Sequence, residues 1–213
     1  MTDGLDRSEI IELARDVIRK DAAAVLAAAT ALDGGFLATV QLLLACSGKV
    51  LVTGMGTSGS TAQRIAHLLS VSGTPALFTH AADGLHGGLG AVTANDVIVA
   101  ISKGGESDEL NEFARRAKER GAPIVAMTAD RDSTLAKLAD AVVVIETPPD
   151  TDPGGMIAMG SALAACAVGD TLVVVLMALR QYPWQSFEFT HPGGAVGKSI
   201  EQRQQTTAET GAS

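Results

Sequence analysis

Aromatic residues are scarce in this chain of 213 residues, at 3% of its composition. Trp184 and Tyr182 are its single tryptophan and single tyrosine. The core must therefore consist mainly of Ala, Val, Leu and Ile side chains. The stacking of nucleic-acid bases on aromatic rings, a common mode of single-strand binding, is disfavoured for the same reason.

Basic residues are also in the minority, with 16 lysines and arginines against 24 aspartates and glutamates. The formal net charge is −8, and no cluster of basic residues occurs. This balance argues against nucleic acid or an anionic membrane as a partner, because both attract positively charged surfaces. A local site for a small phosphate remains compatible with it.

Cysteine is rare, and Cys46 and Cys166 lie far apart, which favours a reducing compartment over a disulfide framework. The first ten residues are polar and acidic, so we expect no signal peptide and a cytoplasmic protein. Residues 156–179 are apolar enough to span a bilayer, but Asp170 and two glycines interrupt them. We expect a helix buried in a soluble core and no membrane partner.

Five short runs rich in Val and Ile recur along the chain, and their apolar residues are continuous rather than alternating. The runs occupy residues 49–54, 75–80, 96–102, 122–128 and 141–146. Continuous runs of this kind are typical of strands buried on both faces of a parallel sheet. Helical stretches separate them, so the sequence predicts an α/β fold with a doubly wound, five-stranded parallel sheet flanked by helices.

The pattern predicts a single domain over residues 1–213, without repeats or linkers. Its expected parts are N-terminal helices at about 8–47, a sheet core at about 48–150, a long C-terminal helix at about 156–181 and a frayed tail at about 201–213.

Two glycine-rich loops follow the first and third predicted strands, each at the start of a helix. Ligands of doubly wound sheets bind beyond the carboxyl ends of the strands, where helix N-termini attract anions. We therefore expect the two loops to bind one phosphate group, with Lys103 adding charge. The expected contacts are Gly56, Thr57, Ser58, Ser102, Gly104 and Ser107.

The first loop also matches the GxGxxG pattern of dinucleotide-binding proteins. That interpretation requires an acidic residue at the end of the second strand, about 20 residues further on, to bind the ribose. The second predicted strand ends in Thr79 and His80 instead. The missing acidic residue disfavours the dinucleotide interpretation, and we expect no cofactor.

Three histidines and two carboxylates lie in the predicted loops. His80, His86 and His191 occur near glycines, and Glu106 lies in the second glycine-rich loop. Either Asp150 or Asp152 supplies a further acid after the fifth strand. Such a set favours proton transfer or metal binding.

Five motifs together resemble the sugar isomerase (SIS) domain family, most closely the isomerase domain of arabinose 5-phosphate isomerases. They are GMGTSG (54–59), SGTPALFTHAADGLHGGLG (72–90), ISKGGES (101–107), DPGGMIAMGSALA (152–164) and HPGGAVG (191–197). The resemblance covers about residues 10–200 and implies the flavodoxin-like SIS fold. The paired CBS modules that usually follow in those isomerases are not expected in this chain.

The resemblance implies aldose–ketose isomerisation of a sugar phosphate through an enediol, with neither cofactor nor metal required. Its catalytic positions match His86, Glu106, His191 and Asp150, and the last match could slip to Asp152. It also implies substrate contacts from Gly73, Thr74 and His80, and a possible zinc contact at His80. Homodimers or homotetramers with sites at subunit interfaces are expected.

The chain departs from the family pattern in both glycine-rich loops. Thr57 stands where the isomerases have a lysine, and Lys103 and Gly104 interrupt the usual Ser-x-Ser of the second loop. Lys103 could replace the lost cation and would then join the catalytic set. Alternatively, the chain is a non-catalytic sugar-phosphate sensor.

Overall fold

The structure is a computed structural model, and it describes residues 4–193 and residue 197. The expected tail at about 201–213 and residues 194–196 of the HPGGAVG motif lie outside the described residues. The sheet is five-stranded and entirely parallel, with the order β2-β1-β3-β4-β5. The strands are β1 (Val50–Gly54), β2 (Ala76–Phe78), β3 (Val97–Ile101), β4 (Ile124–Thr128) and β5 (Ala141–Val144).

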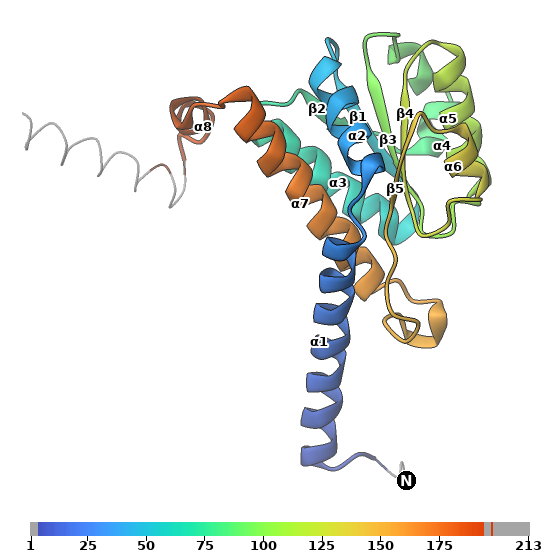
Figure 1. Cartoon of the computed structure of the whole chain (residues 1–213), viewed down its shortest axis with the longest axis vertical. Helices are drawn as coiled ribbons and strands as arrows, with labels where there is room; N and C mark the ends of the chain where they lie inside the picture. The colour runs from blue at the N-terminus through green and yellow to red at the C-terminus, as the bar shows by residue number, and fades with distance from the viewer. Residues whose placement is uncertain (1–3, 194–196, 198–213) are drawn as a thin grey trace, which may run out of the picture.

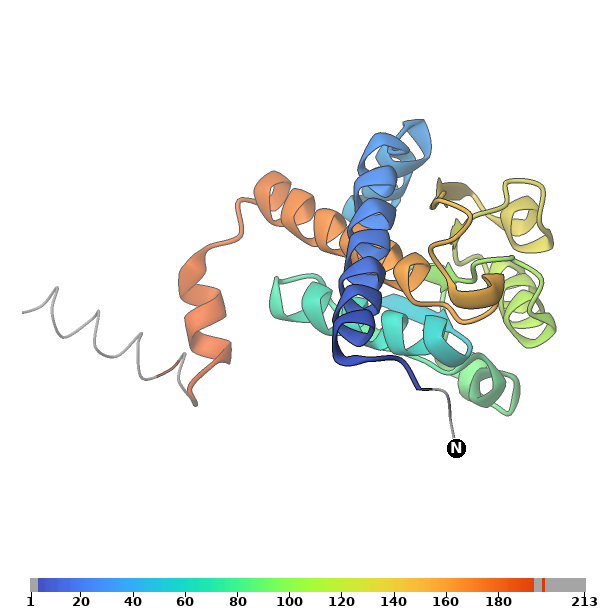
Figure 2. The same cartoon turned by 90° about the horizontal axis from the view of Figure 1, so that it is seen from below.

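The predicted fold class is confirmed, because helices cover both faces of this parallel sheet (Figures 1 and 2). The first face carries α1 (Arg7–Thr30), α2 (Gly34–Ala45), α3 (Gly56–Val71) and α7 (Gly160–Arg180). The opposite face carries α4 (Ala81–Leu85), α5 (Asp108–Glu119) and α6 (Thr134–Leu138). Alternate strand residues supply the two cores: Val50 and Val52 face the first layer, and Leu51 faces the second.

The order of the strands reverses between β1 and β3, which are adjacent in the sheet. This is the switch point of a flavodoxin-like strand order, where ligands bind in a crevice outside the carboxyl ends of the strands. The two glycine-rich loops follow β1 and β3, so they flank this point.

Helix α7 is long and apolar enough to cross a membrane. Helices α1 and α2 reach the necessary length and hydropathy only when they are taken together, and the pair is bent by 78°. In the fold, α7 lies against α1 and α3. Its buried Ala164, Val168, Leu172 and Leu176 belong to the core of the first face. The helix begins at Gly160, later than expected, because a short 3-10 turn (η2, Pro153–Gly155) precedes it.

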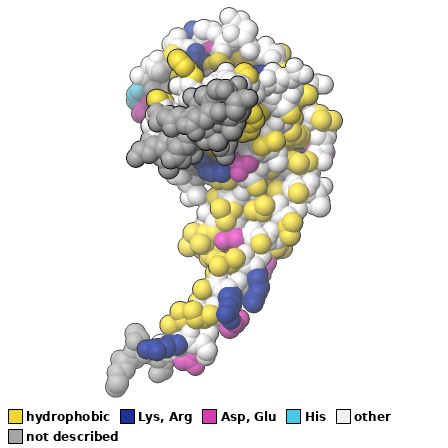
Figure 3. Space-filling view, turned by 90° about the vertical axis from the view of Figure 1, so that its left-hand side faces the viewer, with side chains coloured by type: hydrophobic (Ala, Val, Ile, Leu, Met, Phe, Trp, Pro, Cys, Tyr) yellow, Lys and Arg dark blue, Asp and Glu magenta, His cyan; other side chains and the backbone are white. Residues whose placement is uncertain are grey.

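Two helices extend away from the sheet. The N-terminal half of α1 projects below the body of the molecule in Figure 1, and α8 (Trp184–Thr190) lies apart at the other end of α7. Hydrophobic side chains run along the projecting part in Figure 3. Among the exposed large residues are Ile11, Ile18 and Phe189.

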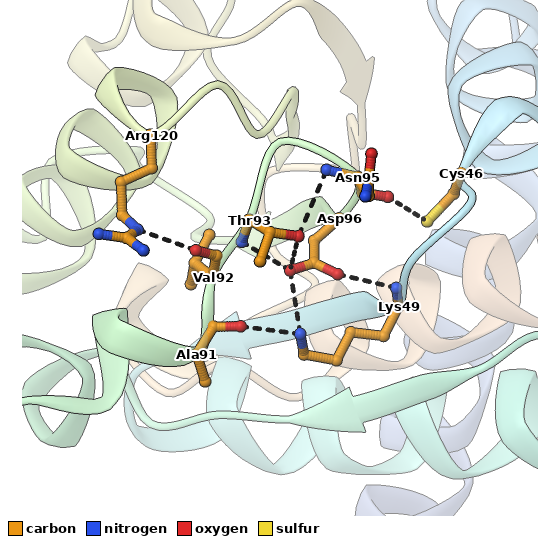
Figure 4. A network of polar contacts seen from close by, with 8 residues as sticks. All are labelled: Cys46, Lys49, Ala91, Val92, Thr93, Asn95, Asp96 and Arg120. Atoms are coloured by element: carbon orange, nitrogen blue, oxygen red, sulfur yellow. Dashed lines mark hydrogen bonds and ion pairs between the residues drawn. The ribbon is translucent and has the colours of Figure 1, made fainter.

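A network at the amino ends of the strands ties β1 to β3 (Figure 4). The Asp96 side chain is 2% exposed and accepts hydrogen bonds from the Lys49 backbone (2.9 Å) and the Thr93 backbone (2.8 Å). The Lys49 ammonium lies 2.9 Å from the same carboxylate. Burial would raise the pKa of Asp96, but these donors outweigh it and lower the pKa.

Candidate functional site

A cavity opens at the carboxyl ends of the strands, between the strand-end loops and the start of α7. Its polar lining consists of Ser58, Thr61, Lys103, Thr128 and Ser161. The rest of the lining is apolar, from the ends of β3, β4 and β5 and from alanines of α7. A cavity with a few polar groups on an apolar wall is the usual form of a small-molecule site.

The loop after β1 brings the chain very close to itself. A Cβ atom on Gly54 would lie 2.7 Å from the Ser58 carbonyl oxygen, so this position requires glycine. Helix α3 then begins without a side-chain cap in the described structure. Its first N–H groups therefore remain available to an anion, because they have no partner within the helix. Ser58 lines the cavity, whereas Gly56 and Thr57 are exposed at the helix start.

The loop after β3 is closed by its own polar groups. The Gly105 N–H donates to the Ser102 hydroxyl at 3.1 Å, and the Ser102 and Ser107 hydroxyls lie 3.5 Å apart. Gly104 is exposed between them. Helix α5 also starts without a side-chain cap in the described part of the chain, so its first N–H groups remain available to an anion, as those of α3 do.

Lys103 lies on the cavity wall and forms an ion pair with Asp152, which precedes α7. The distance from Nζ to Oδ2 is 2.7 Å, and the side chains are 43% and 2% exposed, respectively. Asp152 also accepts hydrogen bonds from the Met159 N–H (2.9 Å), the Ser161 N–H (3.1 Å) and the Ser161 hydroxyl (2.5 Å).

These donors determine the protonation state of Asp152. Burial alone would raise its pKa, but the hydrogen bonds from Lys103, Ser161 and Met159 lower the pKa to about 2. A carboxylate that is this acidic and fully hydrogen-bonded is a poor acceptor for a substrate proton. Asp152 is thus an unfavourable choice for the base that the alternative alignment would place there.

Glu106 faces α6 rather than the cavity lining. Its Oε1 accepts from the Thr134 N–H at 2.8 Å and its Oε2 from the Thr134 hydroxyl at 2.7 Å. The backbone and side-chain donors of Thr134 lower the pKa of Glu106. Asp150 is also outside the lining: it is exposed and lies 3.5 Å from the Lys20 ammonium of α1.

The three predicted histidines lie at helix ends outside the cavity lining. His80 precedes α4 and the exposed His86 follows it, on the opposite face of the sheet from α3 and α7. His191 ends α8, where its Nδ1 lies 2.8 Å from the Phe187 carbonyl oxygen and its ring stacks on Phe187 at 3.9 Å. Because α8 lies apart from the body (Figure 1), His191 is remote from the cavity of its own chain.

Two predicted substrate contacts occupy the amino edge of the sheet. Gly73 and Thr74 precede β2, and Thr74 is buried and accepts a hydrogen bond from Arg180. A Cβ on Gly73 would lie 2.3 Å from the Tyr182 ring. Both residues therefore support packing beside the end of α7, at the opposite edge from the glycine-rich loops.

No group of three or more His, Cys, Asp or Glu side chains is arranged to hold a metal within residues 4–193 and 197. The expected zinc contact of His80 thus lacks a complete ligand set in a single copy of the described chain.

Three polar residues of the cavity lining were not predicted from the sequence: Thr61, Thr128 and Ser161. Thr128 had a usable signal, since it ends the fourth apolar run at the edge where ligands bind. Ser161 carried a weaker one, as a hydroxyl residue beside the glycine that begins α7. Thr61 lies within α3, and its spacing one turn after Ser58 places both on one face.

A model of the SIS domain family matches residues 43–175, which include the strands, both glycine-rich loops and most of α7. The chain belongs to the SIS domain family. The matched range contains all five strands of the sheet and every residue that lines the cavity.

Among the relatives of this SIS protein is the arabinose 5-phosphate isomerase KpsF of Escherichia coli O6:H1, which is 33% identical over 91% of this chain and 60% of that protein. The arabinose 5-phosphate isomerase KdsD of Yersinia pestis is 35% identical over 83% of this chain and 54% of that protein. The chain thus spans little more than half the length of these curated relatives. A solved structure of an Escherichia coli CFT073 protein in complex with arabinose 5-phosphate superposes with a TM-score of 0.84 and 28% identity, covering 88% of this chain and all of that one.

Proposed function

We propose that this SIS protein binds a sugar phosphate in the cavity and catalyses its aldose–ketose isomerisation, as an arabinose 5-phosphate isomerase does. The observation that carries the proposal is that Lys103, which follows β3 beside the switch point of the sheet, lines the cavity and pairs with Asp152. The similarity to two arabinose 5-phosphate isomerases, and to a protein solved with arabinose 5-phosphate bound, supports the substrate class.

We place the phosphate group between the starts of α3 and α5, beside the cavity. Their unpaired N–H groups and the hydroxyls of Ser58 and Ser107 can donate hydrogen bonds to its oxygens. Lys103 supplies the positive charge that Thr57 does not. This charge would bind the phosphate or stabilise the enediolate oxygen that forms during the reaction.

The chemistry requires opening of the sugar ring and then movement of a proton between two neighbouring carbons. His86 or His191 is proposed to open the ring, and Glu106 or Asp150 to take the proton from the carbon next to the carbonyl. Return of this proton to the former carbonyl carbon, together with transfer of the hydroxyl proton from the oxygen of the neighbouring carbon to the former carbonyl oxygen, completes the isomerisation. For Glu106 this role requires the carboxylate to leave Thr134.

A homo-oligomer would bring the remote groups together. The exposed hydrophobic residues on α1, α7 and α8 include Ile18 (68% exposed), Val174 (64%) and Phe189 (86%). Large apolar patches of this kind mark protein interfaces. We propose a homodimer or homotetramer in the cytoplasm, in which a second copy supplies His191 to the cavity.

The test is proton exchange in heavy water. Wild-type protein is incubated with arabinose 5-phosphate and other pentose, hexose and tetrose phosphates. Deuterium appearing at the carbon next to the carbonyl, and its loss in Glu106→Gln, is the expected result. Glu109→Gln is the control, because Glu109 is exposed in the first turn of α5 and outside the cavity lining. Absence of exchange with every sugar phosphate that binds would refute the isomerase.

A sugar-phosphate sensor without turnover is the second candidate. It is favoured by the engagement of both candidate bases elsewhere, Glu106 with Thr134 and Asp150 with Lys20. A sensor would bind sugar phosphate with an affinity that survives Glu106→Gln, and it would exchange no deuterium. The same experiment therefore separates the two functions.

A further inference from the structure

Two buried aspartates of the fold each hold a lysine, and they do so at opposite edges of the sheet. Asp96 binds Lys49 at the amino edge, and Asp152 binds Lys103 at the carboxyl edge. Both carboxylates are 2% exposed, and both also accept two backbone N–H groups and one hydroxyl. The surroundings of the two ammonium groups differ, and this difference indicates function.

The Lys49 ammonium has a second protein partner, because it donates to the Ala91 carbonyl oxygen at 2.8 Å (Figure 4). The Lys103 ammonium has Asp152 as its only hydrogen-bond partner within the described residues, and Lys103 lines the cavity. An ammonium group has three donors. Lys103 therefore keeps donors for a ligand, whereas Lys49 completes a structural network.

Asp152 has no comparable capacity left. Its Oδ1 accepts the N–H groups of Met159 and Ser161, and its Oδ2 accepts the Ser161 hydroxyl and the Lys103 ammonium. The carboxylate is thereby fixed to the start of α7, on the same element that lines one side of the cavity. The Lys103 ammonium is therefore bound to a rigid acceptor, although the lysine side chain itself is flexible and 43% exposed.

We propose that Asp152 is a positioning residue, which holds the Lys103 ammonium on the cavity wall so that it meets the anionic oxygens of a sugar phosphate. The proposal rests on the proposed function and adds a residue to it. Free in solvent, the lysine side chain would have to be ordered each time a ligand binds. Asp152 orders the lysine side chain before a ligand binds, because the charge and position of Asp152 are set by α7. The entropic cost of ordering is then not part of the binding free energy.

A double-mutant cycle tests this role. Lys103→Met, Asp152→Asn and the double variant are compared with wild type by calorimetric titration with arabinose 5-phosphate. Loss of the charged contact should weaken binding about ten- to a hundredfold in Lys103→Met. Asp152→Asn keeps the shape and should weaken binding roughly three- to tenfold, which corresponds to ordering one long side chain. The double variant should bind no worse than Lys103→Met, because Asp152 acts only through Lys103.

The matched control is the second lysine–aspartate pair. Lys49→Met and Asp96→Asn remove the same groups from a similar network at the other edge of the sheet. They should lower the thermal unfolding temperature without changing the affinity for arabinose 5-phosphate. If Asp152→Asn does not fold, Lys103→Arg is the second variant. It keeps the charge but moves it, so binding should still fall by roughly threefold or more.

The outcomes separate this proposal from the isomerase itself. Losses that add in the double variant, or a Lys103→Arg variant that binds as wild type does, would overturn the positioning role. Non-additive losses in a protein that binds but exchanges no deuterium would support the positioning role and refute the isomerase. Absence of binding by the wild type would overturn both.

Discussion

Glu106 and Thr134 are joined by two hydrogen bonds, in which the backbone N–H and the hydroxyl of the threonine donate to the two carboxylate oxygens. Both bonds favour the charged carboxylate and lower the pKa of Glu106. Replacing the hydroxyl by a methyl group in Thr134→Val removes one of the two donors. We expect the pKa of Glu106 to rise toward its ordinary value, which NMR titration of the labelled carboxyl carbon would measure.

If Glu106 is the base, the acidic limb of the pH–rate profile should move to higher pH in the same variant, because a raised pKa delays ionisation. Thr171→Val is the control, since the Thr171 hydroxyl bonds within α7 and lies outside the cavity lining. A Glu106 titration that is identical in wild type and Thr134→Val would contradict the geometry.

Negative charge introduced at the phosphate loops should strongly weaken sugar-phosphate binding. Ser58→Asp and Ser107→Asp each place a carboxylate at the start of α3 or α5, where the ligand's anionic group is proposed to lie. Repulsion between like charges should lower the affinity strongly. Ser70→Asp, an exposed position near the end of α3, is the control with the same charge change. Unchanged calorimetric affinity in both loop variants would show that the phosphate binds elsewhere.

Lowering the pH should decrease the free energy of unfolding, and part of this decrease should depend on Asp152. Its pKa is about 2 in the folded protein, against an ordinary value of 3.8, so it adds stability that is present above the ordinary value. This contribution is about 2 kcal/mol, and it is lost as the pH falls from 3.8 toward 2. Urea unfolding of wild type between pH 7 and 3 should show the first part of this loss, whereas Asp152→Asn should lack it. Parallel pH profiles for the two proteins would contradict the ion pair.

Gly105 is required by the shape of the second loop. Its φ angle is +67°, and a Cβ atom would lie 2.2 Å from the Ser133 hydroxyl oxygen. Gly105→Ala should therefore lower the free energy of unfolding by about 1–3 kcal/mol. Gly104→Ala is the control, because no atom lies within 4 Å of its Cβ position. Equal stability of the two variants in urea would show that the loop adapts.

Much of this architecture could be predicted from the sequence, because buried parallel strands have a recognisable pattern, a short continuous run of apolar residues. All five apolar runs contain strands, and Ser58 and Lys103 line the cavity at the predicted strand ends. The location of Thr74 at the amino edge could also have been predicted, since it precedes the second predicted strand. Contacts between separate loops could not be predicted: Lys103 contacts Asp152, 49 residues away, and Glu106 contacts Thr134, 28 residues away. Such pairs depend on how loops fold over the sheet, and local patterns do not encode them.

We expect the projecting part of α1 to form an interface between copies of this chain. Ile11 and Ile18 are seven residues apart, so they share one face of the helix, and they are 51% and 68% exposed. Burial of such a face against a second copy would remove it from water. The proposed assembly is one in which His191 of one copy reaches the cavity of another. Sedimentation of the wild type should show a dimer or tetramer, and the double variant Ile11→Glu/Ile18→Glu should shift it to a monomer with reduced turnover. Arg19→Glu is the control, since it changes the charge by the same amount on the same helix and its side chain is 67% exposed. A wild type that sediments as a monomer at micromolar concentration, or a double variant that assembles unchanged, would rule out this interface.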